Sequence, residues 1–147
     1  MRALLVGLAL LAACDTGLVR PPQQLVLKLS GPAEVLGQRN PSTGRVECAA
    51  LLLIQASGDG FATWVEARKS IREGSSSRSD VLTSGELQII FATDMVQAGE
   101  EYTGQIIGEG TGTFEVDLVL TYQTTIEGED GPLRESTYTY TCRAPAG

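Results

Sequence analysis

The chain has 147 residues, of which 11 are basic and 18 acidic, so its formal net charge at pH 7 is −7. A strongly acidic protein repels phosphate backbones, and we therefore expect no nucleic-acid partner. The chain contains no histidine, which is the commonest nitrogen ligand of zinc and the usual base of a hydrolytic triad. Composition therefore argues against nucleic-acid binding, a zinc site and histidine-dependent hydrolysis.

The N-terminus begins with a basic residue, Arg2, followed by an apolar run over residues 3–13 and then Cys14. As a helix this run would rise only about 16 Å, which is too short for a hydrocarbon core of roughly 30 Å. A basic start, a short apolar core and small residues before a cleavage site are typical of a secretory signal. We therefore expect residues 1–13 to be a signal peptide.

The last residues of this stretch, Leu11-Ala12-Ala13-Cys14, resemble the lipobox of bacterial lipoproteins. The resemblance covers about a tenth of the chain. It implies cleavage before Cys14, acylation of the Cys14 thiol with chains such as palmitate, and a membrane anchor in the bacterial cell envelope. The alternative is a plain signal peptide whose cysteine is incidental.

Residues 14–24 contain Gly17, Pro21 and Pro22 and show no periodicity, so we expect a tether behind the lipid-bearing cysteine. Residues 25–147 are enough for one domain with its own core and too few for two ordinary ones. Cys48 and Cys142 remain in this domain, and in an oxidising compartment such a pair most often forms a disulfide. Two free thiols or a metal-binding pair are the alternatives.

From Leu25 onward apolar residues alternate with a period of two, which predicts β-strands. Val46–Ser57 is the most apolar run and carries apolar residues at both odd and even positions. This pattern is typical of a central strand, so we expect both its faces to be at least partly covered. No mature segment has sustained helical periodicity. The main predicted strands span residues 25–30, 46–57, 61–71, 87–92, 102–107, 114–123 and 133–143.

Three polar stretches interrupt the strands, at residues 37–44, 72–80 and 127–132. Binding residues are often carried on such loops, which makes all three candidates for contact with a partner. In strict strand alternation the first and the third lie at the same end of the domain. The second has mixed charge around a serine run, and we expect it to be a polar loop.

The strand pattern predicts an all-β protein built as an antiparallel β-sandwich. Cys48 on an early central strand with Trp64 on the next resembles immunoglobulin domains, and residues 96–102 resemble the turn and tyrosine of fibronectin type III modules. Tyr140-Thr141-Cys142 is similar to the immunoglobulin tyrosine-x-cysteine but comes too near the end, so we favour Tyr102 as the corner tyrosine. The resemblance implies an immunoglobulin-like sandwich with an extra C-terminal strand joined by Cys142. A small meander barrel of lipocalin type is the alternative.

Candidate reactive groups all have simpler structural interpretations. Glu115 and Asp117 point the same way from one strand, which suits glycoside cleavage and equally suits a solvated face. Residues 75–77, a serine run, are more typical of a loop than of a nucleophile. Acidic turns at Asp59 and at residues 127–130 could hold calcium but are usually soluble hairpin tips. A single tryptophan in a sandwich is usually buried, so we expect Trp64 in the core.

These observations predict a lipid-anchored envelope protein with a non-catalytic binding or scaffolding domain. The expected partners are the membrane, through acyl chains on Cys14, and an envelope protein or glycan. We expect no catalytic residue, no cofactor and no metal site. A carrier of a small apolar ligand in a barrel and, less favoured, an enzyme are the alternatives.

Overall fold

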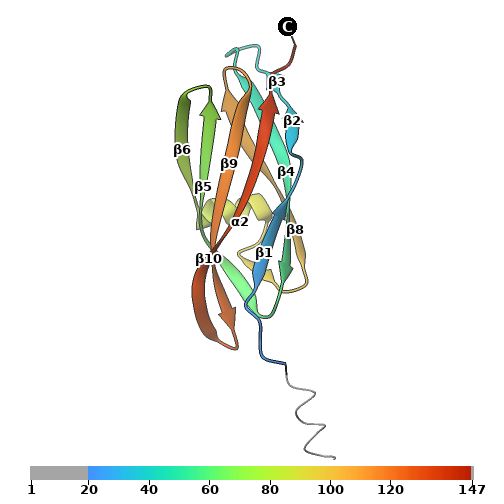
Figure 1. The fold of residues 1–147 in the computed structure, drawn as a ribbon, viewed down its shortest axis with the longest axis vertical. Helices are drawn as coiled ribbons and strands as arrows, with labels where there is room; N and C mark the ends of the chain where they lie inside the picture. Colours follow the sequence, from blue (N-terminus) through green and yellow to red (C-terminus); the bar gives the residue numbers. More distant parts are fainter. Residues whose placement is uncertain (1–19, 147) are drawn as a thin grey trace, which may run out of the picture.

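Two β-sheets pack face to face in the computed structural model, which describes residues 20–146 (Figure 1). In the first sheet β4 is central, with β8 along one edge and β1 and β3 along the other. Its strands are β1 (Val26–Ser30), β3 (Gln38–Arg39), β4 (Val46–Ser57) and β8 (Glu101–Gly110).

The second sheet has the order β2, β10, β9, β5, and both β6 and β7 pair with the remaining edge of β5. Its strands are β2 (Glu34–Leu36), β5 (Phe61–Glu73), β6 (Ser76–Thr83), β7 (Met95–Gln97), β9 (Phe114–Ile126) and β10 (Glu129–Arg143). One helix, α2 (Ser84–Phe91), connects β6 to β7. Every pairing between these strands is antiparallel except that of β2 with β10.

No strand of one sheet pairs with a strand of the other within residues 20–146. The all-β sandwich predicted from the sequence is therefore confirmed, and the closed meander barrel is wrong. The last strand, β10, pairs with β9 along most of its length and with β2 on its other side. It is an internal strand of the second sheet.

The core lies between the sheets and follows the period-two pattern of the longest strands. On β9 the residues of the predicted apolar face, from Phe114 to Tyr122, are all buried. On β4 the even-numbered residues are buried. The largest fully buried side chains include Tyr122, Tyr140, Phe114, Leu25, Leu52, Ile54, Leu87 and Ile106.

A bulge in β5 decides the position of the single tryptophan. The register with β9 shifts between Trp64 and Glu66, so Trp64 and Ala67 both face the core. Strict alternation along the predicted strand at residues 61–71 would put Trp64 on the same face as Glu66 and Arg68, and the bulge shows that this assignment is wrong. The expectation of a buried Trp64 is confirmed, because 5% of it is exposed and its Nε1 donates to Thr93 O at 2.8 Å.

The predicted strand at residues 87–92 is wrong, because most of this segment belongs to α2. Thr83 caps the helix by accepting a hydrogen bond from Glu86 N at 3.3 Å. Leu87 and Phe91, four residues apart, are buried on one helix face. Phe91 packs against Trp64 with ring centroids 5.3 Å apart. Burial of this face against the core favours the helix over an extended strand.

Hydrogen bonds of tyrosine hydroxyl groups connect the two sheets and stabilise one turn. Tyr140 on β10 donates to Ile106 O on β8 at 2.9 Å, and Tyr122 on β9 accepts from Leu27 N on β1 at 3.2 Å. Burial is the main reason why the pKa of Tyr140 is raised well above its usual value. Tyr102 accepts from Gln97 N at 3.2 Å and so fixes the turn between β7 and β8. This is the corner position expected for Tyr102.

Candidate interaction surface

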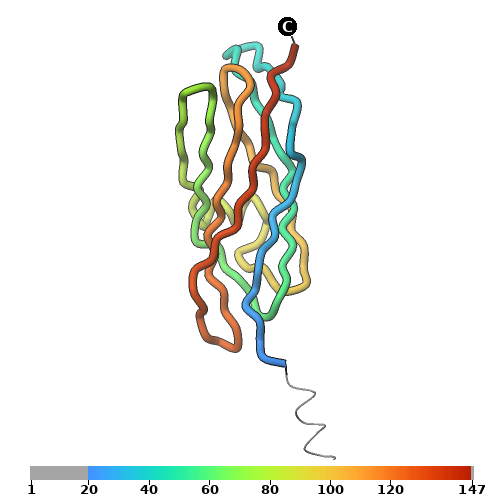
Figure 2. Tube along the Cα trace, viewed as in Figure 1, coloured from blue at the N-terminus to red at the C-terminus, as the bar shows by residue number. Residues whose placement is uncertain are grey.

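The described chain enters at one end of the sandwich and leaves at the other (Figure 2). At the entry end the carboxylate of Asp59 accepts from Gln23 N at 2.8 Å and lies 3.5 Å from Arg20. The hairpin tip between β9 and β10 lies at this same end (Figure 1). The acidic turns considered for calcium therefore surround the point where the N-terminal segment meets the domain.

The three predicted loops do not lie where alternation placed them. Residues 37–44 and the β5–β6 hairpin tip lie at the exit end, whereas residues 127–132 lie at the entry end (Figure 1). The prediction that residues 72–80 form a polar loop is also wrong. Most of them belong to β5 and β6, which are separated only by Gly74 and Ser75. The first and third loops are therefore at opposite ends of the molecule.

Glu73 joins the exit-end hairpin to the turn between β8 and β9. Its carboxylate accepts from Gly112 N at 2.7 Å, from Thr111 N at 2.9 Å and from the Thr111 hydroxyl at 2.9 Å. The Gly112 hydrogen bond is the main reason why the pKa of Glu73 lies below its usual value, with Thr111 and the charge of Arg78 acting in the same direction. The carboxylate holds these two turns together.

Large apolar side chains are exposed on the outer face of the four-stranded sheet and on the neighbouring strand β2 of the second sheet. Leu51 on β4 and Ile107 on β8 are each 57% exposed, and Leu36 on β2 is 69% exposed. Ala49 lies directly opposite Ile107 in the β4–β8 register and is also exposed. The prediction that both faces of β4 are at least partly covered is therefore wrong at Ala49 and Leu51, whereas Leu53 farther along the same face is half-buried. We call Leu36, Ala49, Leu51 and Ile107 the outer apolar patch.

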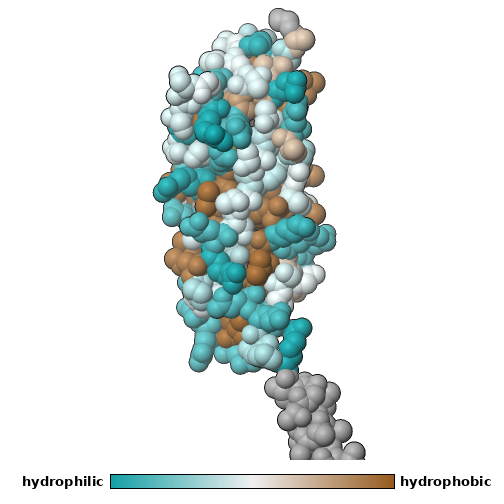
Figure 3. All heavy atoms as spheres, in the orientation of Figure 1, coloured by the Kyte–Doolittle hydropathy of each residue, from teal (hydrophilic) through white to brown (hydrophobic). Residues whose placement is uncertain are grey.

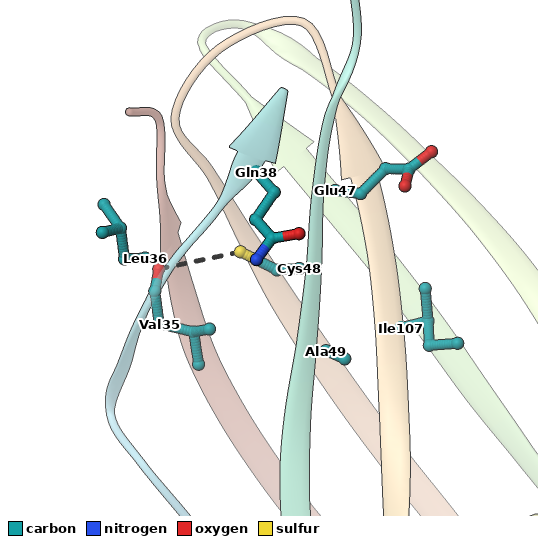
Figure 4. Close-up of a pocket in the computed structure, with 7 residues that line it drawn as sticks. All are labelled: Val35, Leu36, Gln38, Glu47, Cys48, Ala49 and Ile107. Carbon is teal, nitrogen blue, oxygen red and sulfur yellow. Dashed lines mark hydrogen bonds between the residues drawn. The ribbon is translucent and has the colours of Figure 1, made fainter. Parts of the chain in front are cut away.

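A groove of about 340 Å³ adjoins this patch, and three of the patch residues, Leu36, Ala49 and Ile107, form part of its lining (Figure 4). It forms because the chain leaves the first sheet after β1, runs as β2 in the second sheet, and returns as β3. Between Glu47 and Leu53 the corresponding edge of β4 consequently has no strand partner in the described chain. The groove is lined by Val35, Leu36, Gln38, Glu47, Cys48, Ala49 and Ile107.

The Cys48–Cys142 disulfide predicted from the sequence is present and lies next to the groove. It joins β4 of the first sheet to β10 of the second, with the two Cα atoms 5.9 Å apart. Both cysteines are buried. The Cys48 sulfur lies 3.6 Å from Val35 O (Figure 4), and a disulfide sulfur has no proton to donate, so this is a packing contact. Because Cys48 lines the groove, the disulfide connects this part of its lining to β10 of the second sheet.

The other candidate groups are part of ordinary surface interactions. Arg72 forms ion pairs with both Glu115 and Asp117, each at 3.0 Å. Ser76 and Ser77, from the predicted serine loop, belong to β6. Within the described residues no group of three or more His, Cys, Asp or Glu side chains is placed to hold a metal ion.

The face of the molecule seen in Figure 3 mixes hydrophobic and hydrophilic residues without one continuous apolar area. The predicted signal peptide and the lipidation residue Cys14 lie outside the described residues. Among residues 20–146 no helix is long and apolar enough to cross a membrane.

Comparison with known proteins gives no family: no family model and no curated protein matches the chain. A crystal structure of a Bordetella pertussis protein described as ApaA is similar, with a TM-score of 0.56 and 14% identity over 88% of this chain and 99% of that one. A structure of an Archaeoglobus fulgidus protein covers 82% of this chain and 98% of its own at 7% identity, with a TM-score of only 0.33. The first likeness concerns the fold alone.

Leu36 and Ile107 were not among the residues singled out from the sequence. The signal that could have found the patch is the apolar character of the odd-numbered positions of β4. We expected these positions to form a second face that is at least partly covered. Only the arrangement of the sheets shows that Ala49 and Leu51 on this face are exposed.

Proposed function

We propose that this chain is a cell-envelope lipoprotein, anchored through acyl chains on Cys14, whose β-sandwich binds another envelope protein without catalysis. The anchor rests on the lipobox-like residues Leu11 to Cys14. The binding role rests on one observation, the outer apolar patch beside the groove. Exposed apolar side chains gathered next to a hollow and rimmed by polar residues are typical of protein contact sites.

The chemistry of the groove favours a protein over a glycan as the partner. Sugar rings are usually held by aromatic side chains together with polar groups, and no aromatic residue lines this groove. Its lining is aliphatic with Gln38 and Glu47 at the rim. An apolar side chain of a partner protein fits such a lining, with polar contacts at its margin.

The position of the groove agrees with the proposed anchor. Cys14 is nine residues before Gln23, so the tether can reach at most about 30 Å. Gln23 is bound at the entry end of the sandwich, whereas β2 and β3, which border the groove, lie towards the exit end (Figure 1). An anchored domain would therefore present the groove away from the membrane.

The test is to replace Leu51 with Glu and identify the proteins that co-purify with the anchored chain. Leu133→Glu is the matched control, because Leu133 is 58% exposed on a strand of the other sheet. We expect Leu51→Glu to reduce recovery of the partner at least about tenfold, as burying a charge at an interface costs more than 1.4 kcal/mol. Leu133→Glu should retain the partner.

If a folded Leu51→Glu variant keeps every partner of the parent, this surface is not the binding site. Recovery of a glycan instead of a protein, lost in the same variant, would contradict the choice of partner while keeping the surface.

A further inference from the structure

The strand β6 leaves one edge of the second sheet open. Within residues 20–146 it pairs only with β5, over eight residues and without a bulge, and it is the outermost strand on its side of Figure 1. Seven of its eight residues are exposed, and its sequence, Ser-Ser-Arg-Ser-Asp-Val-Leu-Thr, contains neither proline nor lysine. Those are common devices by which proteins block an open edge.

The hairpin geometry shows which backbone groups point to the open side. Gly74 and Ser75 form a two-residue turn, closed by the pair Glu73 and Ser76. In such a hairpin the closing pair exchanges hydrogen bonds, and hydrogen-bonded pairs alternate along the strands. The even-numbered residues of β6 therefore bond to β5. The N–H and C=O groups of Ser77, Ser79 and Val81 face outward.

The charges of β6 are arranged so that a second copy of the strand is complementary to the first. If two β6 strands pair antiparallel with Ser79 opposite Ser79, Arg78 of each copy lies opposite Asp80 of the other. This register also pairs Ser77 with Val81 and brings their outward-facing backbone groups together. Arg78 and Asp80 then form non-hydrogen-bonded pairs, in which opposing side chains lie closest.

In the single chain, Arg78 and Asp80 make fewer ion pairs and hydrogen bonds than their charged groups allow. No ion pair of the described residues includes Asp80. Arg78 donates one hydrogen bond to Glu109 O, and a guanidinium group has five N–H donors in all. Lys69 lies directly opposite Asp80 in the β5–β6 register, but its ammonium group donates to Ile107 O at 2.8 Å and forms no ion pair with Asp80. A second copy would supply Asp80 with an ion-pair partner and still leave the contact between Arg78 and Glu109 in place.

We propose that the chain forms a two-fold symmetric dimer through antiparallel pairing of β6 with β6, centred on Ser79. The two second sheets then form one continuous sheet across the dimer. This contact is independent of the outer apolar patch, because β6 lies at the opposite edge of the second sheet from β2 and the other patch residues belong to the first sheet. Because the edge of a single strand buries little surface, the dimer is a weak, reversible one.

Disulfide trapping tests both the contact and its register. In a Cys14→Ser background, Ser79→Cys places two cysteines about 5.5 Å apart between Cα atoms, within the range for a disulfide. Ser77→Cys is the matched control, since it is on the same edge and face but its two copies lie about 14 Å apart. We expect mild oxidation to give a covalent dimer with Ser79→Cys only. Equal trapping of both variants, or trapping of neither, overturns the proposal.

Charge exchange provides a second test in the full chain carrying Cys14→Ser. Arg78→Asp places like charges opposite each other, and we expect dimerisation measured by sedimentation equilibrium to weaken about tenfold. The double variant Arg78→Asp with Asp80→Arg restores opposite charges and should restore dimerisation. A parent chain that is monomeric at about 1 mM, where only about −4 kcal/mol would suffice for association, overturns the proposal. So does a double variant that dimerises no better than the single one.

Discussion

Single side chains decide which parts of this molecule are joined. The Glu73 carboxylate accepts hydrogen bonds from Gly112 and Thr111 and so links the β5–β6 hairpin to a turn that lies about forty residues later. These bonds favour the charged form of the carboxyl group, which is why its pKa is lowered. A group whose pKa is lower in the folded state stabilises that state above its unfolded pKa.

Glu73→Gln tests this contact. At pH 7 we expect the variant to unfold with a free energy about 1 kcal/mol lower than that of the parent, because hydrogen bonds to the charge are lost. The difference should disappear as the pH falls through the usual carboxyl pKa of 4.5 and then through the lowered folded value. Urea unfolding at several pH values measures it. A difference that is constant with pH would contradict the role of the charge.

At the scale of elements, α2 depends on a position in β8 that carries no side chain. Gly104 is buried, and a Cβ atom there would lie 2.7 Å from side-chain atoms of Ile90 and Phe91 and 2.8 Å from Ile90 O. The helix therefore packs directly on the backbone of the strand. The strand β8 continues through this glycine, from Glu101 to Gly110.

Gly104→Ala should lower the free energy of unfolding by about 1–3 kcal/mol, because the backbone of α2 must move to make room. Gly112→Ala is the control, since the nearest atom to its added Cβ would be 3.9 Å away. Denaturant unfolding of both variants measures the effect. Equal stability of the two would show that the helix is not held closely against β8.

At the scale of the whole molecule, the disulfide and the proposed anchor act on different properties. The disulfide closes a loop of 94 residues and joins the two sheets. The chain-entropy model assigns about 4–5 kcal/mol of stability to such a loop. Acylation of Cys14 would leave the fold unchanged and determine where the domain is held.

Cys14→Ser should abolish acylation and either release the domain from the membrane or block its processing. The double variant Cys48→Ala with Cys142→Ala is the control, because it removes the other two cysteines and keeps the lipobox. Membrane fractionation and intact mass report the outcome. A serine variant that is processed and stays with the membrane like the parent would contradict the lipoprotein proposal.

Much of the fold could be predicted because long strands carry a strong local signal. In β9 each inward residue from Phe114 to Tyr122 is apolar, and this long alternation is compatible with only one choice of buried face. The short strands β2, β3 and β7 have no such signal, as two or three residues cannot define a period. The helix had a capping pattern at Thr83 and Glu86, but its apolar run also fits a strand.

By itself the sequence determined the sandwich class, the strand β4 as part of the core, the cysteine pair and the lipobox-like start, because these depend on residue type and near-neighbour spacing. Only the tertiary structure decided which face of β4 is covered, which loops share an end, and where a bulge turns Trp64 inward. These features depend on how strands distant in sequence pack together. The outer apolar patch and the open edge of β6 belong to this second group, since a face or an edge is free only relative to the elements that could have covered it.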